Sequence, residues 1–227
     1  MLATLPLPFY FLIGGLLSIF LPKGVFKSSF VCLVPILALI VLLNGTWDEG
    51  FEVQLLDLEL NFMRVDKLST VFGIIFCIAA FLGNVFAFHL RESAQPFVAL
   101  IYAGAAIGAV FAGDLITLFV YWELTAISSV FLIWARKTEG AYYSGMRYLI
   151  IQVLSGIMLL FGVALFYFET GSISFVKMEL NSLATALIFV AFGIKCAFPF
   201  MHNWLQDSYP SATITGTVIL SAFTTKL

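Results

Sequence analysis

Long runs of apolar residues, separated by short polar segments, form most of the chain. A helix needs about 20 apolar residues to cross the hydrocarbon core of a bilayer. Several runs reach about 18 residues or more, so the pattern predicts an all-α membrane protein, a polytopic bundle of about eight transmembrane helices. The expected helices cover about 3–20, 28–43, 68–89, 96–112, 114–134, 146–168 and 183–200, and an eighth begins near 213.

Residues 44–67 depart from this pattern. The segment is rich in acidic residues, and FEVQL and LDLELNF each alternate apolar and polar side chains with a period of two. This alternation predicts two short strands that form an external hairpin. Because strand backbone cannot lie unpaired in lipid, we expect the hairpin to lie in water or against partner protein.

The composition supports a membrane protein and excludes several other classes. The chain is 62% hydrophobic and 11% charged, whereas soluble domains are about 45–50% apolar and about 25% charged. No basic stripe indicates a nucleic-acid partner. The three cysteines lie apart without a C-x-x-C pair, which indicates neither a metal site nor a disulfide framework. We also find no nucleotide loop, haem spacing or nucleophile constellation, so we expect no cofactor.

The distribution of lysine and arginine predicts the orientation of the bundle. The first residues, MLATLPLPFY, lack a positive segment and a small-residue cleavage site, so we interpret them as a retained helix. With the N-terminus outside, the inner loops carry six lysines and arginines and the outer loops three. We therefore expect a multi-pass protein of the cell (inner or plasma) membrane with its N-terminus outside.

Two kinds of residue mark the expected surfaces of the helices. Gly104, Gly108 and Ala112 recur at a spacing of four, which predicts a small-residue face for close helix packing. Aromatic residues near helix ends are typical of the membrane–water interface. We assign this interfacial position to Trp47, Trp134, Trp204 and Tyr209.

Three ionisable residues fall at membrane depth: Glu123, Lys195 and Lys226. A lysine at the centre of a membrane helix costs roughly 2.5–3.5 kcal/mol on insertion scales, and such residues usually serve ion pathways. At low dielectric constant, the proton affinity of each group depends on whether its neighbour is charged and close. The set therefore predicts a proton relay. The alternative is a static buried ion pair that only orders the bundle.

Pro199 predicts a break in the seventh helix. A proline ring clashes with the carbonyl four residues before it, which here belongs to Lys195. Broken helices that carry ionisable groups recur in transporters, although a simple packing kink would show the same spacing. His202 follows, and its imidazole suits proton exchange near neutral pH. A histidine near a helix end is also often just hydrogen-bonded.

Four segments together resemble a known family. They are DLITLFVYWELTAISSVFLIW, RYLIIQVLSG, FGIKCAFPFMHNWLQDSYP and LSAFTTK. They look like the antiporter-like membrane subunits shared by Mrp-type sodium/proton antiporters, respiratory complex I and membrane-bound hydrogenases, with a leaning toward the Mrp D-type subunit. By this resemblance Glu123 matches the fifth-helix glutamate, Lys195 the lysine of the broken seventh helix and Lys226 the eighth-helix lysine.

The resemblance also implies a domain organisation. The family has about fourteen helices with two inverted five-helix repeats, so we expect this chain to be an N-terminal half whose last helix is incomplete. Residues 1–95 would hold the first three helices and the hairpin at 44–67. Residues 96–227 would form the first antiporter-like repeat, helices four to eight.

Three functions remain open on these grounds. The first is a subunit of a multisubunit cation/proton antiporter that moves protons through Glu123, Lys195 and Lys226, with other membrane subunits, protons, sodium and the bilayer as its partners. The second is a proton-pumping subunit of a redox-driven complex, either an NADH-quinone oxidoreductase or a membrane-bound hydrogenase, without its own redox centre. The third is a non-conducting scaffold fragment. Roles for Asp66 and Arg147 are also left open.

Overall fold

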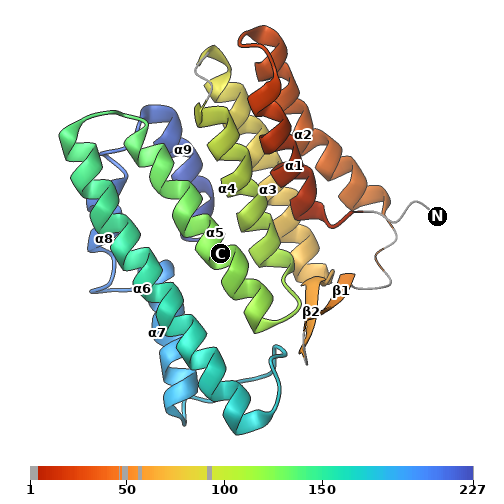
Figure 1. Ribbon diagram of the computed structural model, residues 1–227, viewed down its shortest axis with the longest axis vertical. Coiled ribbons are helices and arrows are strands. Elements are labelled where there is room, and N and C mark those ends of the chain that lie inside the picture. The colour runs from red at the N-terminus through yellow and green to blue at the C-terminus, as the bar shows by residue number, and fades with distance from the viewer. Residues whose placement is uncertain (1–4, 46, 48–50, 56–57, 91–93, 227) are drawn as a thin grey trace.

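The structure, a computed structural model, describes residues 5–45, 47, 51–55, 58–90 and 94–226. It is a helical bundle with one small hairpin at its edge (Figure 1). The helices are α1 (Leu7–Phe20), α2 (Val25–Asn44), α3 (Lys67–Phe86), α4 (Ala94–Phe111), α5 (Leu115–Trp134), α6 (Glu139–Thr170), α7 (Leu183–Lys195), α8 (Asn203–Ser208) and α9 (Ile214–Phe223). A 3-10 turn, Ala87–His89, extends α3, and the strands are β1 (Phe51–Leu55) and β2 (Leu58–Met63).

Within the described residues, five helices are long and apolar enough to cross a membrane. They are α2, α3 with its 3-10 turn, α4, α5 and α6. The apolar helices α1, α7 and α9 are shorter. The expectation of an all-helical membrane bundle is therefore confirmed, whereas eight full spans remain a prediction.

Side-chain caps explain where several helices begin. Asp66 and Ser69 form a capping box at the start of α3, and Ser182 and Thr185 form one at the start of α7. Asp114 accepts hydrogen bonds from two backbone N–H groups at the start of α5. These bonds satisfy amides that have no partner inside the first turn of a helix.

The sixth helix begins earlier than expected. We predicted 146–168, with the preceding residues in a loop, whereas α6 runs from Glu139 to Thr170. The Thr138 side chain accepts a hydrogen bond from the N–H of Ala141, and Glu139 places a negative charge in the first turn. Both features favour a helix start. Our prediction gave too much weight to the polar residues of this segment.

The predicted hairpin is confirmed. β1 and β2 pair antiparallel, and Leu55 pairs with Leu58. The hairpin is attached to the junction of α4 and α5: the N–H of Asn61 donates to the Asp114 carboxylate at 2.8 Å, and the N–H of Gly113 donates to the Asn61 carbonyl at 2.9 Å. The hairpin therefore lies against one end of the bundle and contacts protein there.

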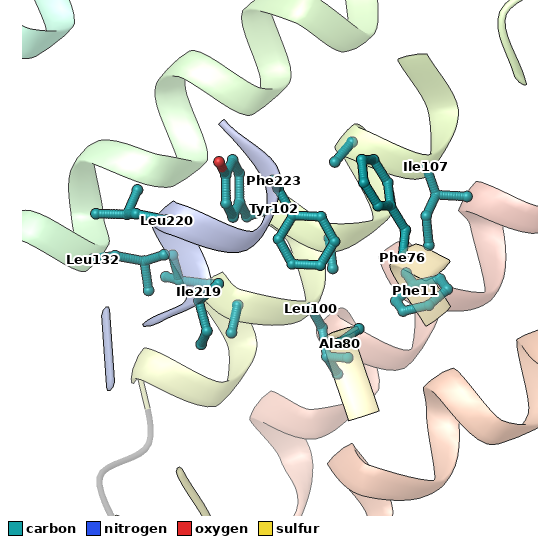
Figure 2. Packing of buried hydrophobic residues seen from close by; sticks show 14 of the residues in the cluster. Phe11, Phe76, Ala80, Leu100, Tyr102, Ile107, Leu132, Ile219, Leu220 and Phe223 are labelled. Atoms are coloured by element: carbon teal, nitrogen blue, oxygen red, sulfur yellow. The ribbon is translucent and has the colours of Figure 1, made fainter. Parts of the chain in front are cut away.

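The centre of the bundle joins α1, α3, α4 and α9 through apolar and aromatic side chains. Figure 2 shows Phe223 of α9 between Phe76 of α3 and Tyr102 of α4. Its ring meets theirs edge-on at centroid distances of 5.1 and 5.6 Å. Such edge-to-face contacts add to the stabilisation that area burial supplies. Helices far apart in sequence are thus joined in one core.

The small-residue face of α4 packs closely, as predicted. A methyl group on Gly104 would lie 2.7 Å from the Cβ of Phe11 in α1. A methyl group on Gly108 would overlap the ring of Tyr121 in α5. The missing side chains at these two positions therefore let α1 and α5 approach α4.

The seventh helix breaks as predicted, but earlier than the expected range 183–200. α7 ends at Lys195, the residue whose carbonyl a helical Pro199 would meet. The chain then passes through left-handed backbone at Ala197 (φ 56°) and Phe200 (φ 70°) before α8 begins. The N–H of Phe198 donates to the Gly193 carbonyl at 2.9 Å and closes the end of α7.

Candidate functional site

Lys195 is the most deeply buried charged group of the candidate site, with a relative exposure of 1%. Its Nζ donates to the hydroxyl of Thr125 at 2.9 Å and to the carbonyl of Trp122 at 3.4 Å. The ammonium also lies over the indole of Trp122, 4.8 Å from the ring centroid, which is within the range of a cation–π contact. Neutral groups of α5 therefore surround the last residue of α7.

Glu123 faces the same region but is not in contact with Lys195. No carboxylate oxygen of the described residues lies within 4.0 Å of Nζ, and the ion pairs of this part of the chain lie elsewhere. The two charges are nevertheless close enough to interact through space. The structure thus brings the predicted pair into one site and leaves a gap between them.

The carboxylate of Glu123 lies against the backbone of α6. A methyl group on Gly156 would overlap its Oε1 atom. Oε1 is buried and accepts no hydrogen bond from any described residue. A buried carboxylate oxygen without a partner is costly, and such atoms are concentrated where function requires them.

A row of polar side chains on α6 completes the site. Ser155 accepts a hydrogen bond from Nε1 of Trp122 at 3.1 Å and donates to the carbonyl of Gln152 at 2.6 Å. Gln152 is fully buried, at 0% exposure, and its amide oxygen and nitrogen have no partner among the described residues. Tyr148 lies one turn earlier and is also buried. Sequence reasoning had not singled out any of these residues.

A signal in the sequence could have found this row. Tyr148, Gln152 and Ser155 occur at i, i+4 and i+7 of an otherwise apolar segment, which places them on one helix face. Only ionisable residues had been considered at membrane depth. Neutral polar residues at helical spacing are weaker signals, but they satisfy the same condition of being costly in lipid.

A cluster of hydroxyl groups lies on the side of the site nearer α9. Tyr148 and Ser129 share a hydrogen bond of 2.7 Å. Tyr102 of α4 and Thr224, the residue that caps α9, share one of 2.5 Å. Thr224 also lies near the hydroxyls of Tyr148 and Tyr209. The hydroxyl cluster therefore connects α4, α5, α6 and the end of α9.

Lys226 is not brought to Lys195. Its side chain is exposed, and Nζ donates to the Ser221 carbonyl at 2.6 Å and to Thr225 at 3.0 Å. The helix α9 ends at Phe223, so Lys226 follows the helix, whereas we expected it within a membrane helix. Thr224, two residues earlier, is buried at 1% exposure, so the chain passes from the core to the surface between Thr224 and Lys226.

The segment after the break differs in part from expectation. His202 precedes α8, is half-buried and makes no capping hydrogen bond. Trp204 was assigned to the membrane interface, but it is 3% exposed and donates to the Ile194 carbonyl at 3.0 Å. The chain folds back after the break and places this indole against the end of α7. Arg147 pairs with Asp207 at 3.2 Å on the surface.

The C-terminal half of the chain, residues 112–227, matches the family described as "NADH:quinone oxidoreductase/Mrp antiporter, TM". The chain belongs to this family. It is therefore a multi-pass membrane protein, and the resemblance found in the sequence is confirmed. The matched range contains Glu123, Lys195 and the polar row on α6.

Relatives in the family include subunits of two kinds. The chain is 32% identical to the A-type subunit of the Na(+)/H(+) antiporter of Alkalihalophilus pseudofirmus over 73% of its length, and 26% identical to the D-type subunit from the same organism over 88%. It is 28% identical to the N-type subunit of the F(420)H(2) dehydrogenase of Methanosarcina mazei over 79%. The chain spans 23%, 41% and 39% of these relatives' lengths, respectively.

Solved structures share the fold. The chain superposes on a chain of the archaeal membrane-bound sulfane sulfur reductase with a TM-score of 0.81 at 23% identity, over 97% of this chain and 50% of that one. It superposes equally on a chain of the Mrp complex from Dietzia sp., with a TM-score of 0.81 at 21% identity, over 97% and 46%. A chain of respiratory complex I from Thermus thermophilus gives 0.77 at 22%, over 96% and 51%. These relatives are subunits of multisubunit membrane complexes.

Proposed function

We propose that the chain forms one proton half-channel in a subunit of a multisubunit cation/proton antiporter, with Glu123 and Lys195 as its central groups. The observation that supports this most is the state of Lys195: it is 1% exposed, at the end of a broken helix, and held by neutral oxygens. A buried lysine in a permanent ion pair would leave an uncompensated carboxylate on deprotonation. Among the residues that the structure describes, Lys195 has no carboxylate in contact, so the loss of its proton breaks no ion pair there.

The gap to Glu123 supplies the control that a relay needs. When the carboxylate approaches, the charged form of Lys195 is favoured, and when it withdraws to Gly156, proton release is favoured. The buried Oε1 accepts no hydrogen bond from the described residues, which fits a side chain that can occupy more than one position. Proton transfer is thus coupled to the distance between two side chains, and a static pair would not provide this coupling.

We also propose that Lys226 and His202 exchange protons in the outer parts of the same route. Lys226 is exposed and follows Thr224, which is in the hydroxyl cluster. His202 lies in the non-helical segment between the end of α7 and the start of α8. We further propose a cell-membrane location with the N-terminus outside, sodium as the exchanged cation, and no cofactor for this chain.

The experiment is sodium-dependent proton exchange in membrane vesicles that hold the assembled complex, measured without a redox substrate. Glu123→Gln and Lys195→Ala should each abolish exchange, whereas Lys177→Ala, on an exposed residue outside the site, should not change it. Wild-type exchange by Lys195→Ala in correctly assembled complexes would refute the proposed relay.

The second candidate is a proton-pumping subunit of a redox-driven complex. The similarity to the F(420)H(2) dehydrogenase subunit and to chains of two respiratory complexes favours it. The same vesicles separate the two functions. Exchange driven by a sodium gradient alone indicates an antiporter, whereas proton movement that requires an electron donor and acceptor indicates the redox-driven complex.

A further inference from the structure

Two hydrogen bonds set the alignment of α5 against α6. Trp122 bonds to Ser155, and Ser129 bonds to Tyr148. The two helices are antiparallel, and the two bonds are seven residues apart on each of them. Three residues after Trp122 on α5 is Thr125, and three residues before Ser155 on α6 is Gln152. Thr125 and Gln152 therefore lie at the same level. The hydroxyl of Thr125 accepts a hydrogen bond from the Lys195 ammonium.

Gln152 is a buried amide in a polar neighbourhood. Its side chain is 0% exposed, and neither amide atom has a hydrogen-bond partner among the described residues. Buried amides in native proteins are almost always paired with protein or ordered water. A water molecule bound to this amide would have the hydroxyl groups of Thr125 and Tyr148 as further partners. Several polar partners are the usual requirement for buried water.

We propose that Gln152 binds an ordered water molecule that links Lys195 and Thr125 to the Tyr148–Ser129 pair. Gln152 acts as a positioning residue: its amide carries no exchanged proton but offers both a donor and an acceptor to the water. A sodium ion is a poorer occupant, because the Lys195 ammonium lies on the neighbouring Thr125 and would repel it. The inference rests on the proposed relay and extends it to α6.

The water gives the proton a direction. Two of the three N–H groups of Lys195 bond to Thr125 and Trp122. The third passes its proton to the water, and the water passes one of its own protons to the Tyr148 oxygen. Tyr148 passes its hydroxyl proton to the hydroxyl oxygen of Thr224, which lies near it. The proton leaves the cluster to bulk water at the exposed end of the chain beside Lys226. Each intermediate oxygen therefore ends with the number of protons it began with, and Lys195 is left neutral. The route leads from the α7 break to the end of α9.

The test compares Gln152→Met, which keeps the side-chain length without the amide, with Leu154→Met on the exposed face of the same helix. In vesicles that hold the assembled complex, we expect Gln152→Met to lower the exchange rate about tenfold, the order expected from one lost buried hydrogen-bond network. Leu154→Met should match the wild type. Gln152→Ser leaves space for a second water and should restore most of the rate; it also serves where Gln152→Met does not assemble.

A double-mutant cycle checks that the two residues act on one route. Tyr148→Phe should slow exchange, and the combination with Gln152→Met should be no slower than the slower single variant. Multiplied effects would contradict one shared route. A cryo-EM map of the complex that resolves water should show density between Gln152, Thr125 and Tyr148 in the wild type, and none in Gln152→Met.

These outcomes separate the two proposals. Loss of exchange in Lys195→Ala with normal exchange in Gln152→Met would overturn the water link and leave the relay intact. Normal exchange in Lys195→Ala would overturn the relay. A wild-type map without density beside Gln152 would overturn the water site whatever the transport data.

Discussion

Lys195 donates a hydrogen bond to the hydroxyl of Thr125 at 2.9 Å, while no oxygen of Glu123 lies within 4.0 Å of the same ammonium. The pair predicted from the sequence is thus separated, and a neutral side chain occupies the contact position. A lysine that contacts neutral groups can lose its proton more easily than one in a fixed ion pair, because no carboxylate is left unpaired. The contact between Lys195 and Thr125 is therefore the first one to test.

Thr125→Val should slow exchange more than Thr125→Ser. Valine has nearly the same shape but removes the acceptor from the Lys195 ammonium, and a hydrogen bond to a charged group contributes about 1.5–3 kcal/mol. We therefore expect at least about a tenfold lower rate in vesicles for the valine variant. Serine keeps the hydroxyl and should retain most of the rate. Equal rates for both variants would show that this contact has no role in transport.

Gly156→Ala should displace the Glu123 carboxylate. The added methyl group overlaps Oε1, and overpacking of this kind costs about 1–3 kcal/mol. The thermal midpoint of the purified complex and its exchange rate should both fall. Gly140→Ala is the matched control on α6, because no atom lies within 4 Å of a methyl group there. That variant should be neutral or slightly stabilising, since alanine favours helix more than glycine does.

Asp66 should make the stability of α3 depend on pH. The N–H of Ser69 donates to its carboxylate, and this bond is the main cause of a pKa lowered from the usual 3.8. The stabilising contribution is present above the unfolded-state pKa and is lost as pH falls through the lowered folded-state value.

Replacing Asp66 with alanine removes this cap, which costs about 1 kcal/mol at neutral pH. In thermal denaturation of the purified complex, the difference between wild type and variant should be constant from neutral pH down to mildly acidic pH and shrink below it. A difference that persists unchanged in strong acid would contradict the assignment of the carboxylate as the cap. Glu59→Gln, on the hairpin, serves as the control for loss of one acidic residue.

Ala197→Gly should stabilise the break after α7. Ala197 has φ 56°, a left-handed conformation that costs a residue with a Cβ about 1–2 kcal/mol. Glycine removes most of this strain, so the thermal midpoint should rise. Ala186→Gly, at an exposed position inside α7, should lower it, because glycine disfavours helix by about 1 kcal/mol. A lower midpoint for both variants would show that the chain does not hold this break.

The sequence predicted the helices well where a local cause acts. The break at Lys195 follows from the spacing to Pro199, since the clash involves residues four apart. The alternation in FEVQL and LDLELNF likewise predicted the hairpin. The start of α6 was missed because a polar segment such as ARKTEGAYY reads as a loop unless its cap, Thr138, is recognised.

The site was predicted only in part. The sequence pointed to Glu123 and Lys195 because a charged residue in an apolar run can be recognised without a structure, but it did not show the gap between their side chains. Gln152, Thr125 and Tyr148 were missed because each is neutral and common. Their place in the candidate site depends on contacts between residues as far apart as Thr125 and Lys195, and these contacts depend on how α5, α6 and α7 align.

The sequence by itself determined that this chain is a membrane bundle with charged groups inside it, because the cost of placing polar groups in lipid is set by residue type and run length. The tertiary structure alone decided which groups touch. In the structure Lys195 bonds to Thr125 and Trp122, and the Glu123 carboxylate lies against Gly156. Gln152 lies between the Trp122–Ser155 and Ser129–Tyr148 hydrogen bonds. Such choices depend on helix register and close packing, and these arise only when the helices meet.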